Sequence, residues 1–166
     1  MSIVIGIPIL LFLIMFQSAV VSGLPLLSGT ADIVLLALVA WSLQERVRTA
    51  YEWAVIGGLL CSVITRLPFL IPVLGYLAAA FVARFLRRQV WQTPFFVMFI
   101  TTFVGTLIYH ILTWVVLVFQ GVPLPLFESI NLVLLPSALL NLVLALPVYA
   151  IITDLANSIY PEEAET

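Results

Sequence analysis

Charge is scarce in this chain, and its scarcity excludes a water-soluble fold. Only 8% of the 166 residues are charged and 64% are hydrophobic, whereas soluble domains have about 25% charged residues. A soluble domain of this length has no interior large enough to hide so much apolar surface. We therefore predict a membrane protein, built as a single transmembrane domain over residues 1–166.

Reactive side chains are almost as rare as charges. The single cysteine, Cys61, excludes an intrachain disulfide and argues against a cysteine-based metal site. His110 is the only histidine, and no apolar run holds paired carboxylates, a metal-ligand cluster or a glycine-rich phosphate loop. There is no basic tail for nucleic acid. We therefore expect a protein that is not an enzyme, with no catalytic residues, no cofactor and no metal.

The apolar residues come in continuous runs, for example at 9–16, 33–41 and 114–119. The strands of a transmembrane barrel instead alternate apolar and polar positions. The runs therefore predict an all-α polytopic membrane protein.

Lysine is absent, and five of the six arginines fall in two short patches, Arg46 with Arg48 and Arg84 with Arg87 and Arg88. Short arginine-rich loops stay on the cytoplasmic side of a bacterial inner membrane. The two patches therefore fix two points of the chain on one side, and residues 49–83 between them must cross the membrane an even number of times.

Glycine and proline then divide the chain into six transmembrane helices in three hairpins, with both termini cytoplasmic. The middle hairpin turns at Arg66 and Pro68, and Thr30 or Asp32 is expected to cap the second helix. An alternative with five crossings joins the third and fourth helices into one interrupted element, but it places the arginine patches on opposite sides. The predicted helices span about 3–22, 31–45, 49–65, 67–86, 94–119 and 130–154, followed by an acidic tail at 155–166.

Polar side chains inside the predicted spans gather on the fifth and sixth helices. An intramembrane ionisable residue is a candidate functional group by default. The simpler interpretation is that these side chains hydrogen-bond to neighbouring helices, with Asn141 a candidate partner of His110. Pro136 and Pro147 predict a kink in the sixth helix. The residues predicted to make intramembrane polar contacts are Thr102, Thr106, His110, Thr113, Ser137 and Asn141.

The fourth helix carries Gly75, Ala79 and Ala83 at four-residue spacing. Such a stripe of small residues lets a second helix approach closely. We predict it as a docking surface, either for a partner's helix or for another helix of this chain.

Asp32, Arg66 and Glu128 fall near the outer ends of predicted helices. They are candidates for an outward-facing pocket, or else separate caps and interfacial charges.

The five clustered arginines form a predicted cytoplasmic basic patch that binds anionic lipid or a cytoplasmic partner. Aromatic residues flank the inner ends of the predicted helices, a pattern typical of interfacial anchors. These are Trp41, Tyr51, Trp53, Trp91 and Tyr160.

Several short stretches, taken in order, resemble the MreD family of bacterial rod-shape-determining proteins. They are FQS at 16–18, ADIVLL at 31–36, IGGLL at 56–60, VLGYLA at 73–78 and NLVLALP at 141–147. The chain departs from the family at Ala31, where proline is usual, and at 62–65, where the family often has an aspartate.

The resemblance implies a non-enzymatic scaffold subunit of the cell-elongation machinery in the bacterial cytoplasmic membrane, supporting rod shape and peptidoglycan synthesis. Its partner would be the single-span protein MreC, and through it MreB, a RodA-type glycosyltransferase and its transpeptidase. The family fold is similar to the S-components of energy-coupling-factor transporters. A small-solute-binding S-component is therefore the alternative function, although the first predicted helix lacks the Ala-x-x-x-Ala pair with which S-components dock.

Overall fold

The structure, a computed structural model, describes residues 2–23, 25–65, 67–89 and 93–160, and every regular element in these ranges is helical. The prediction of an all-α fold is confirmed. The elements are α1 (Ser2–Ala19), a short 3₁₀ turn η1 (Val21–Gly23), α2 (Ile33–Leu43), α3 (Ala50–Ile64), α4 (Leu70–Gln89), α5 (Pro94–Phe119), α6 (Leu126–Ser129), a π-helical turn η2 (Ile130–Leu134) and α7 (Leu135–Ile159).

The last three elements form one continuous helical segment from Leu126 to Ile159. The predicted helix at 130–154 is therefore too short at both ends. At its start, Pro125 is the N-cap of α6 and accepts the Ser129 amide, so the helix begins directly after this proline. At its end, the helix continues through polar residues such as Ser158, whose hydroxyl donates to the Asp154 carbonyl. Residues 161–166 of the predicted tail lie outside the described residues.

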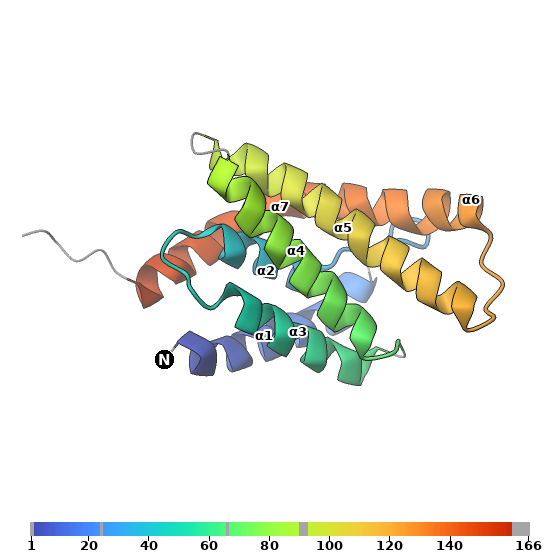
Figure 1. Cartoon of the computed structure of the whole chain (residues 1–166), viewed down its shortest axis with the longest axis horizontal. Coiled ribbons are helices and arrows are strands. Elements are labelled where there is room, and N and C mark those ends of the chain that lie inside the picture. Colours follow the sequence, from blue (N-terminus) through green and yellow to red (C-terminus); the bar gives the residue numbers. More distant parts are fainter. Residues whose placement is uncertain (1, 24, 66, 90–92, 161–166) are drawn as a thin grey trace, which may run out of the picture.

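The six main helical segments in the described ranges, α1 to α5 and the segment from α6 to α7, run back and forth along the molecule (Figure 1). Helix α4 packs extensively against α3 and α5, and α2 packs against α7, α4 and α5. Because α3 and α4 form a hairpin, Glu45–Arg48 and Arg84–Arg88 meet at the same end of the bundle. This arrangement agrees with an even number of passes between the two arginine patches and not with one interrupted element.

Helix α2 is the centre of the bundle. All of its 11 residues are buried, and none is more than 8% exposed. At ~1.5 Å per residue it is about 16 Å long, roughly half of the ~30 Å hydrocarbon core of a bilayer. The predicted second helix at 31–45 therefore needs correction, because α2 is a short interior helix that follows a non-helical segment.

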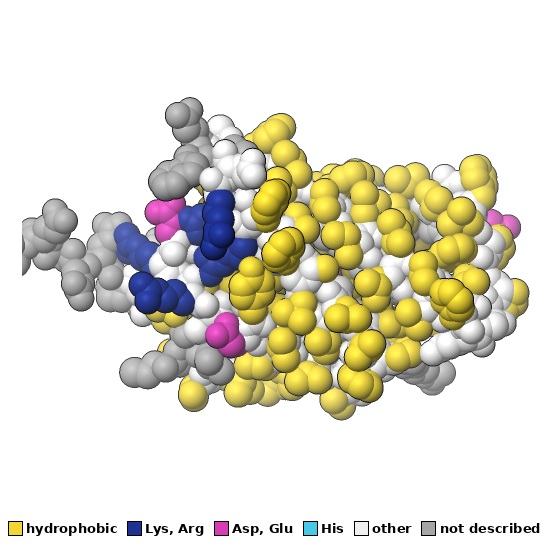
Figure 2. Space-filling view, viewed as in Figure 1, with side chains coloured by type: hydrophobic (Ala, Val, Ile, Leu, Met, Phe, Trp, Pro, Cys, Tyr) yellow, Lys and Arg dark blue, Asp and Glu magenta, His cyan; other side chains and the backbone are white. Residues whose placement is uncertain are grey.

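Three helical segments are long and apolar enough to cross a membrane: Leu70–Gln89, Pro94–Phe119 and Leu126–Ile159. At most 39% of each hydrophobic window is buried inside the bundle, so most of its apolar surface faces outward. In the space-filling view hydrophobic side chains cover most of the visible face, while the arginine side chains gather at one end (Figure 2). Helices α1, α2 and α3 are shorter apolar helices. This distribution is that expected of a membrane protein.

Candidate functional site

The segment before α2 is bound along one side of α7. The Thr30 N–H donates to Ser137 Oγ at 3.1 Å, and the Asp32 N–H donates to Asn141 Oδ1 at 2.7 Å. Both acceptors are on the predicted polar face of the last helix, and both are 1% exposed. The side chains of Ser137 and Asn141 therefore satisfy backbone donors that have no partner within their own segment.

A third backbone bond in this segment depends on a proline. Pro136 has no N–H, so it leaves the carbonyl one turn earlier, Leu132 O, without its usual helical donor. The Ser28 N–H donates to this carbonyl at 3.0 Å. Gly29 packs directly on the same turn, where an added Cβ would lie 2.6 Å from Ser137 N and 2.7 Å from Val133 O. The carbonyl that Pro136 leaves free thus becomes a docking point for the Ser28 segment, within the π-helical turn.

The Asp32 carboxylate caps α2, as predicted. Its Oδ1 accepts the Leu35 N–H at 2.9 Å, and Tyr76 Oη lies 3.2 Å from Oδ1 and 3.0 Å from Oδ2 and donates to the carboxylate. Cys61 Sγ lies 3.5 Å from Tyr76 Oη. The Gln17 side chain also hydrogen-bonds to the carboxylate, and its Oε1 accepts the Val34 N–H at 3.1 Å.

Sequence reasoning missed Gln17 and Tyr76 as partners of Asp32. Gln17 had a signal, because it is the first polar residue after the apolar run that ends at Phe16. Tyr76 stood in the VLGYLA stretch but was not assigned a contact. The three residues come from three different helical segments, so no spacing rule along the chain connects them.

The polar face of α5 reaches Asn141 through a threonine. Asn141 Nδ2 donates to Thr106 Oγ1 at 2.9 Å, and the Thr106 hydroxyl donates to the Thr102 carbonyl at 2.8 Å. The suggested bond between His110 and Asn141 is therefore wrong, since Asn141 is engaged one turn earlier. His110 Nε2 is buried without a hydrogen-bond partner in the described part of the chain. Thr113 bonds within its own helix, to the Tyr109 carbonyl.

The small-residue stripe of α4 is occupied by α5. Gly75, Ala79 and Ala83 are buried, a Cβ on Gly75 would lie 2.5 Å from Tyr109 Cδ2, and one on Gly105 would lie 3.1 Å from Ala79 Cβ. Of the two alternatives, docking of a helix of this chain is the one observed. The prediction that a partner's helix docks on this stripe is corrected accordingly.

The predicted outer pocket does not form from its expected residues. Asp32 is turned into the bundle toward Tyr76, whereas Glu128 is exposed on α6. Arg66 lies outside the described residues. Near Glu128, a largely apolar groove of about 690 Å³ separates α5 from the α6–η2–α7 segment, and His110, Trp114 and Ile130 line it.

All five arginines of the predicted basic patch line one cavity of about 730 Å³. We call it the arginine cavity; it lies between the α2–α3 loop, the end of α4, the start of α5 and the end of α7. Glu45 is its only acidic lining residue among those described. The lining arginines are Arg46, Arg48, Arg84, Arg87 and Arg88.

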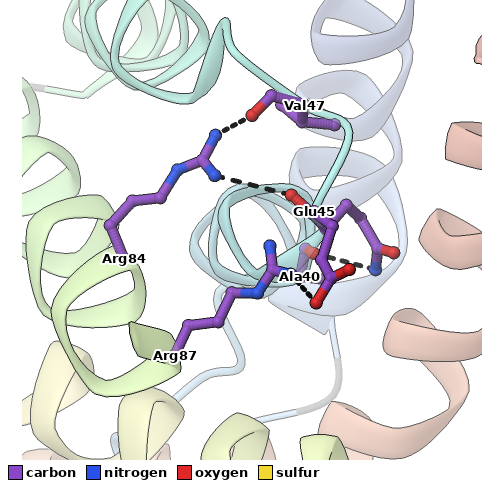
Figure 3. A network of polar contacts seen from close by, with 6 residues as sticks. Ala40, Glu45, Val47, Arg84 and Arg87 are labelled. Carbon is purple, nitrogen blue, oxygen red and sulfur yellow. Dashed lines mark hydrogen bonds and ion pairs between the residues drawn. The ribbon is translucent and has the colours of Figure 1, made fainter. Parts of the chain in front are cut away.

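Two of these arginines fix the walls of the cavity (Figure 3). Arg84 donates to the carbonyls of Gln44 and Val47, which ties the end of α4 to the α2–α3 loop. Arg87 Nη2 forms an ion pair with Glu45 Oε1 at 2.6 Å. On the opposite wall Arg46 donates to the Tyr160 carbonyl at 3.1 Å.

Two of the predicted interfacial aromatics belong to the core instead. Trp41 and Trp53 are 0% and 1% exposed, and their rings stack at 4.1 Å. Their positions at the ends of short helices suggested interfacial anchors, but α2 is enclosed, so its terminal tryptophan meets protein and not lipid. Tyr51 is 42% exposed, as an interfacial residue would be, and Trp91 lies outside the described residues.

Within the described ranges no group of three or more histidine, cysteine, aspartate or glutamate side chains is placed to hold a metal ion. In the described part of the chain, the arginine cavity and the apolar groove beside α5 are candidate sites. Comparison of the chain with models of known protein families, with curated proteins and with solved structures found no match in any of the three.

Proposed function

We propose that the chain is a non-enzymatic scaffold subunit of a bacterial inner membrane, with six crossings and with the arginine end and both termini in the cytoplasm. The observation that carries the proposal is the internal use of the polar groups around Asp32. A solute site needs convergent polar groups that face an open cavity. Here the Asp32 carboxylate accepts from the Tyr76 hydroxyl and the Leu35 N–H. Asn141 accepts the Asp32 N–H and donates to Thr106 Oγ1, so these polar groups are used inside the bundle.

The orientation of the bundle in the membrane follows from the position of its arginines. The arginine cavity collects five positive residues at one end, and the positive-inside rule assigns that end to the cytoplasm. The first residues of α1 and the last residues of α7 lie at the same end (Figure 1). Helices α1 and α3 are short for a bilayer, and local thinning of the membrane makes up such a difference. The interior helix α2 completes its crossing through the non-helical segment at 25–32, which contains a tight turn at Leu26–Gly29.

The partner is assigned from the resemblance to the MreD family, so we propose MreC, with MreB, the RodA-type glycosyltransferase and its transpeptidase reached through it. Because α5 already fills the small-residue stripe of α4, a partner's helix needs another surface. The apolar groove between α5 and α7 lies within the apolar length of the bundle and is lined by His110, whose buried Nε2 has no partner in the described part of the chain.

Topology is tested by reporter fusions after residues 88 and 125. We expect a cytoplasmic reporter to be active at 88 and an external reporter at 125, since α5 separates the two positions. The opposite pattern would reverse the orientation, and the same side for both would contradict a crossing by α5.

The partner is tested by co-purification of the tagged full-length chain from cells that express MreC. We expect MreC to be retained, and Ile111→Trp, which fills the groove from an exposed position on α5, to reduce its recovery. Phe119→Trp, exposed at the end of α5 and outside the groove lining, serves as the control. A retained small molecule together with ATPase subunits would instead establish the S-component alternative and refute the scaffold.

A further inference from the structure

We propose that the arginine cavity is a discrete binding site for the phosphate of an anionic phospholipid headgroup. A basic loop beside a membrane attracts acidic lipid diffusely, at about 1 kcal/mol per basic residue. The structure has more than a basic loop, because the five arginines come from two separate parts of the chain and surround one cavity of about 730 Å³. The proposal rests only on the membrane insertion of the bundle and is independent of the identity of its protein partner.

The walls of the cavity are held partly by hydrogen bonds to uncharged backbone groups. Arg84 donates to two backbone carbonyls, of Gln44 and Val47. Arg46 likewise donates to the Tyr160 carbonyl. These bonds fix the position of the α2–α3 loop against α4 and α7, and the described lining of the cavity has five arginines and one carboxylate, that of Glu45. A fixed concave cluster of guanidinium groups is the geometry that recognises phosphate oxygens.

One internal anion already occupies part of the cavity. Glu45 forms the ion pair with Arg87, and the two side chains are very unequally exposed, at 80% for Glu45 and 19% for Arg87 (Figure 3). The glutamate can swing into solvent, whereas the arginine stays in the wall. A phosphate that enters the cavity would therefore displace Glu45 from Arg87. Glu45 acts as a competitor of the ligand.

The surroundings of the cavity favour a lipid over a soluble phosphate. Its lining passes from the arginines to Pro94 and Val97 at the start of α5. Phe95 and Phe96 beside them are 58% and 63% exposed, and the hydrophobic surface begins next to the arginine end (Figure 2). A phospholipid places its phosphate among arginines and its acyl chains on this apolar surface at the same time. A zwitterionic lipid carries a cation of its own, which the arginines repel.

The test measures lipid binding to the full-length chain in an uncharged detergent by native mass spectrometry, with phosphatidylglycerol, phosphatidylcholine and inorganic phosphate as separate probes. We expect phosphatidylglycerol to bind with a stoichiometry of one and phosphatidylcholine not to bind. Arg87→Gln should weaken binding about tenfold, the loss of one charge-assisted hydrogen bond at ~1.4 kcal/mol per factor of ten. Glu45→Gln should strengthen it by roughly threefold to tenfold, as removal of a competing ion pair would.

Asp154→Asn is the matched control. Asp154 is exposed near the same end of the bundle and outside the cavity lining, and its substitution changes the net charge by the same amount as Glu45→Gln. Because Glu45→Gln predicts a gain, poor folding of a variant cannot imitate the expected result.

Three results would overturn the proposal. Equal gains in Glu45→Gln and Asp154→Asn would mean diffuse electrostatic attraction and no discrete site. Inorganic phosphate that saturates the cavity at the same concentration as phosphatidylglycerol would assign it to a soluble phosphate compound. An acidic peptide that displaces bound phosphatidylglycerol at a lower concentration than the lipid itself requires would assign it to a protein partner.

Discussion

Asn141 offers the most direct test of how the bundle is held together. Its side chain accepts the Asp32 N–H through Oδ1 and donates to Thr106 Oγ1 through Nδ2, so one residue of α7 connects the entry to α2 with the polar face of α5. The substitution Asn141→Leu keeps the approximate size of the side chain and removes both functions. It leaves the Asp32 N–H buried at the start of α2 without an acceptor.

The expected loss is larger than that for an average polar contact in a membrane protein. A buried donor left without a partner costs about 1–3 kcal/mol, and double-mutant cycles between transmembrane helices average ~0.6 kcal/mol with a maximum of ~1.7. Thr106 keeps its bond to the Thr102 carbonyl, so its share of the loss is small. We therefore expect Asn141→Leu to lower the free energy of unfolding by about 2 kcal/mol, mostly through the Asp32 N–H.

The assay is reversible unfolding of the full-length chain in mixed micelles, followed by circular dichroism. Asn131→Leu is the matched control, because Asn131 lies on the same helical segment and donates only to the Phe127 carbonyl one turn away. A Thr106→Val/Asn141→Leu cycle should show coupling, whereas a His110→Leu/Asn141→Leu cycle should be additive within ~0.5 kcal/mol. Equal losses for Asn131→Leu and Asn141→Leu would refute the assigned contact, and coupling to His110 would restore the bond first suggested by the sequence.

Two further substitutions probe the same region by the same unfolding measurement. Gly29→Ala should lower the free energy of unfolding by about 2–3 kcal/mol, because its Cβ would lie 2.6 Å from the backbone of α7. Gly23→Ala is the control and should be nearly neutral, because no atom lies within 4 Å of its added Cβ. Equal effects of the two substitutions would contradict the docking of the loop that contains Gly29. Tyr76→Phe should cost about 1–3 kcal/mol through the lost donor to Asp32, and a neutral result would show that the carboxylate does not depend on it.

The composition of the chain and the positions of its glycine, proline and arginine residues predicted most of the fold. The apolar runs predicted an all-helical chain, and the two arginine patches predicted that α3 and α4 return to the same end of the bundle. The limits of the second helix were less predictable. The run at 31–45 is apolar throughout, and hydropathy does not distinguish a helix that faces lipid from one that is enclosed by other helices, as Ile33–Leu43 is.

The sequence predicted which residues make polar contacts better than it predicted their partners. Spacing along α5 and α7 identified Thr106, Ser137 and Asn141 as residues of contact faces, but spacing within one helix does not give its axial register against another. A shift of one turn decides whether Asn141 meets Thr106 or His110. The partners of Ser137 and Asn141 were also backbone N–H groups of Thr30 and Asp32, which carry no signal in the side-chain sequence.

The beginning of α2 explains why a chain with so few polar residues keeps several of them together. The first N–H groups of a helix have no partner in the helix, and in a membrane interior no water replaces one. At α2 the Val34 N–H is accepted by Gln17 and the Leu35 N–H by Asp32, while Asn141 accepts the N–H of Asp32 itself. A short central helix that follows a non-helical segment therefore requires acceptors from α1 and α7. Gln17, Asp32 and Asn141 are therefore the residues that supply hydrogen-bond acceptors to the otherwise unpaired N–H groups at the beginning of α2.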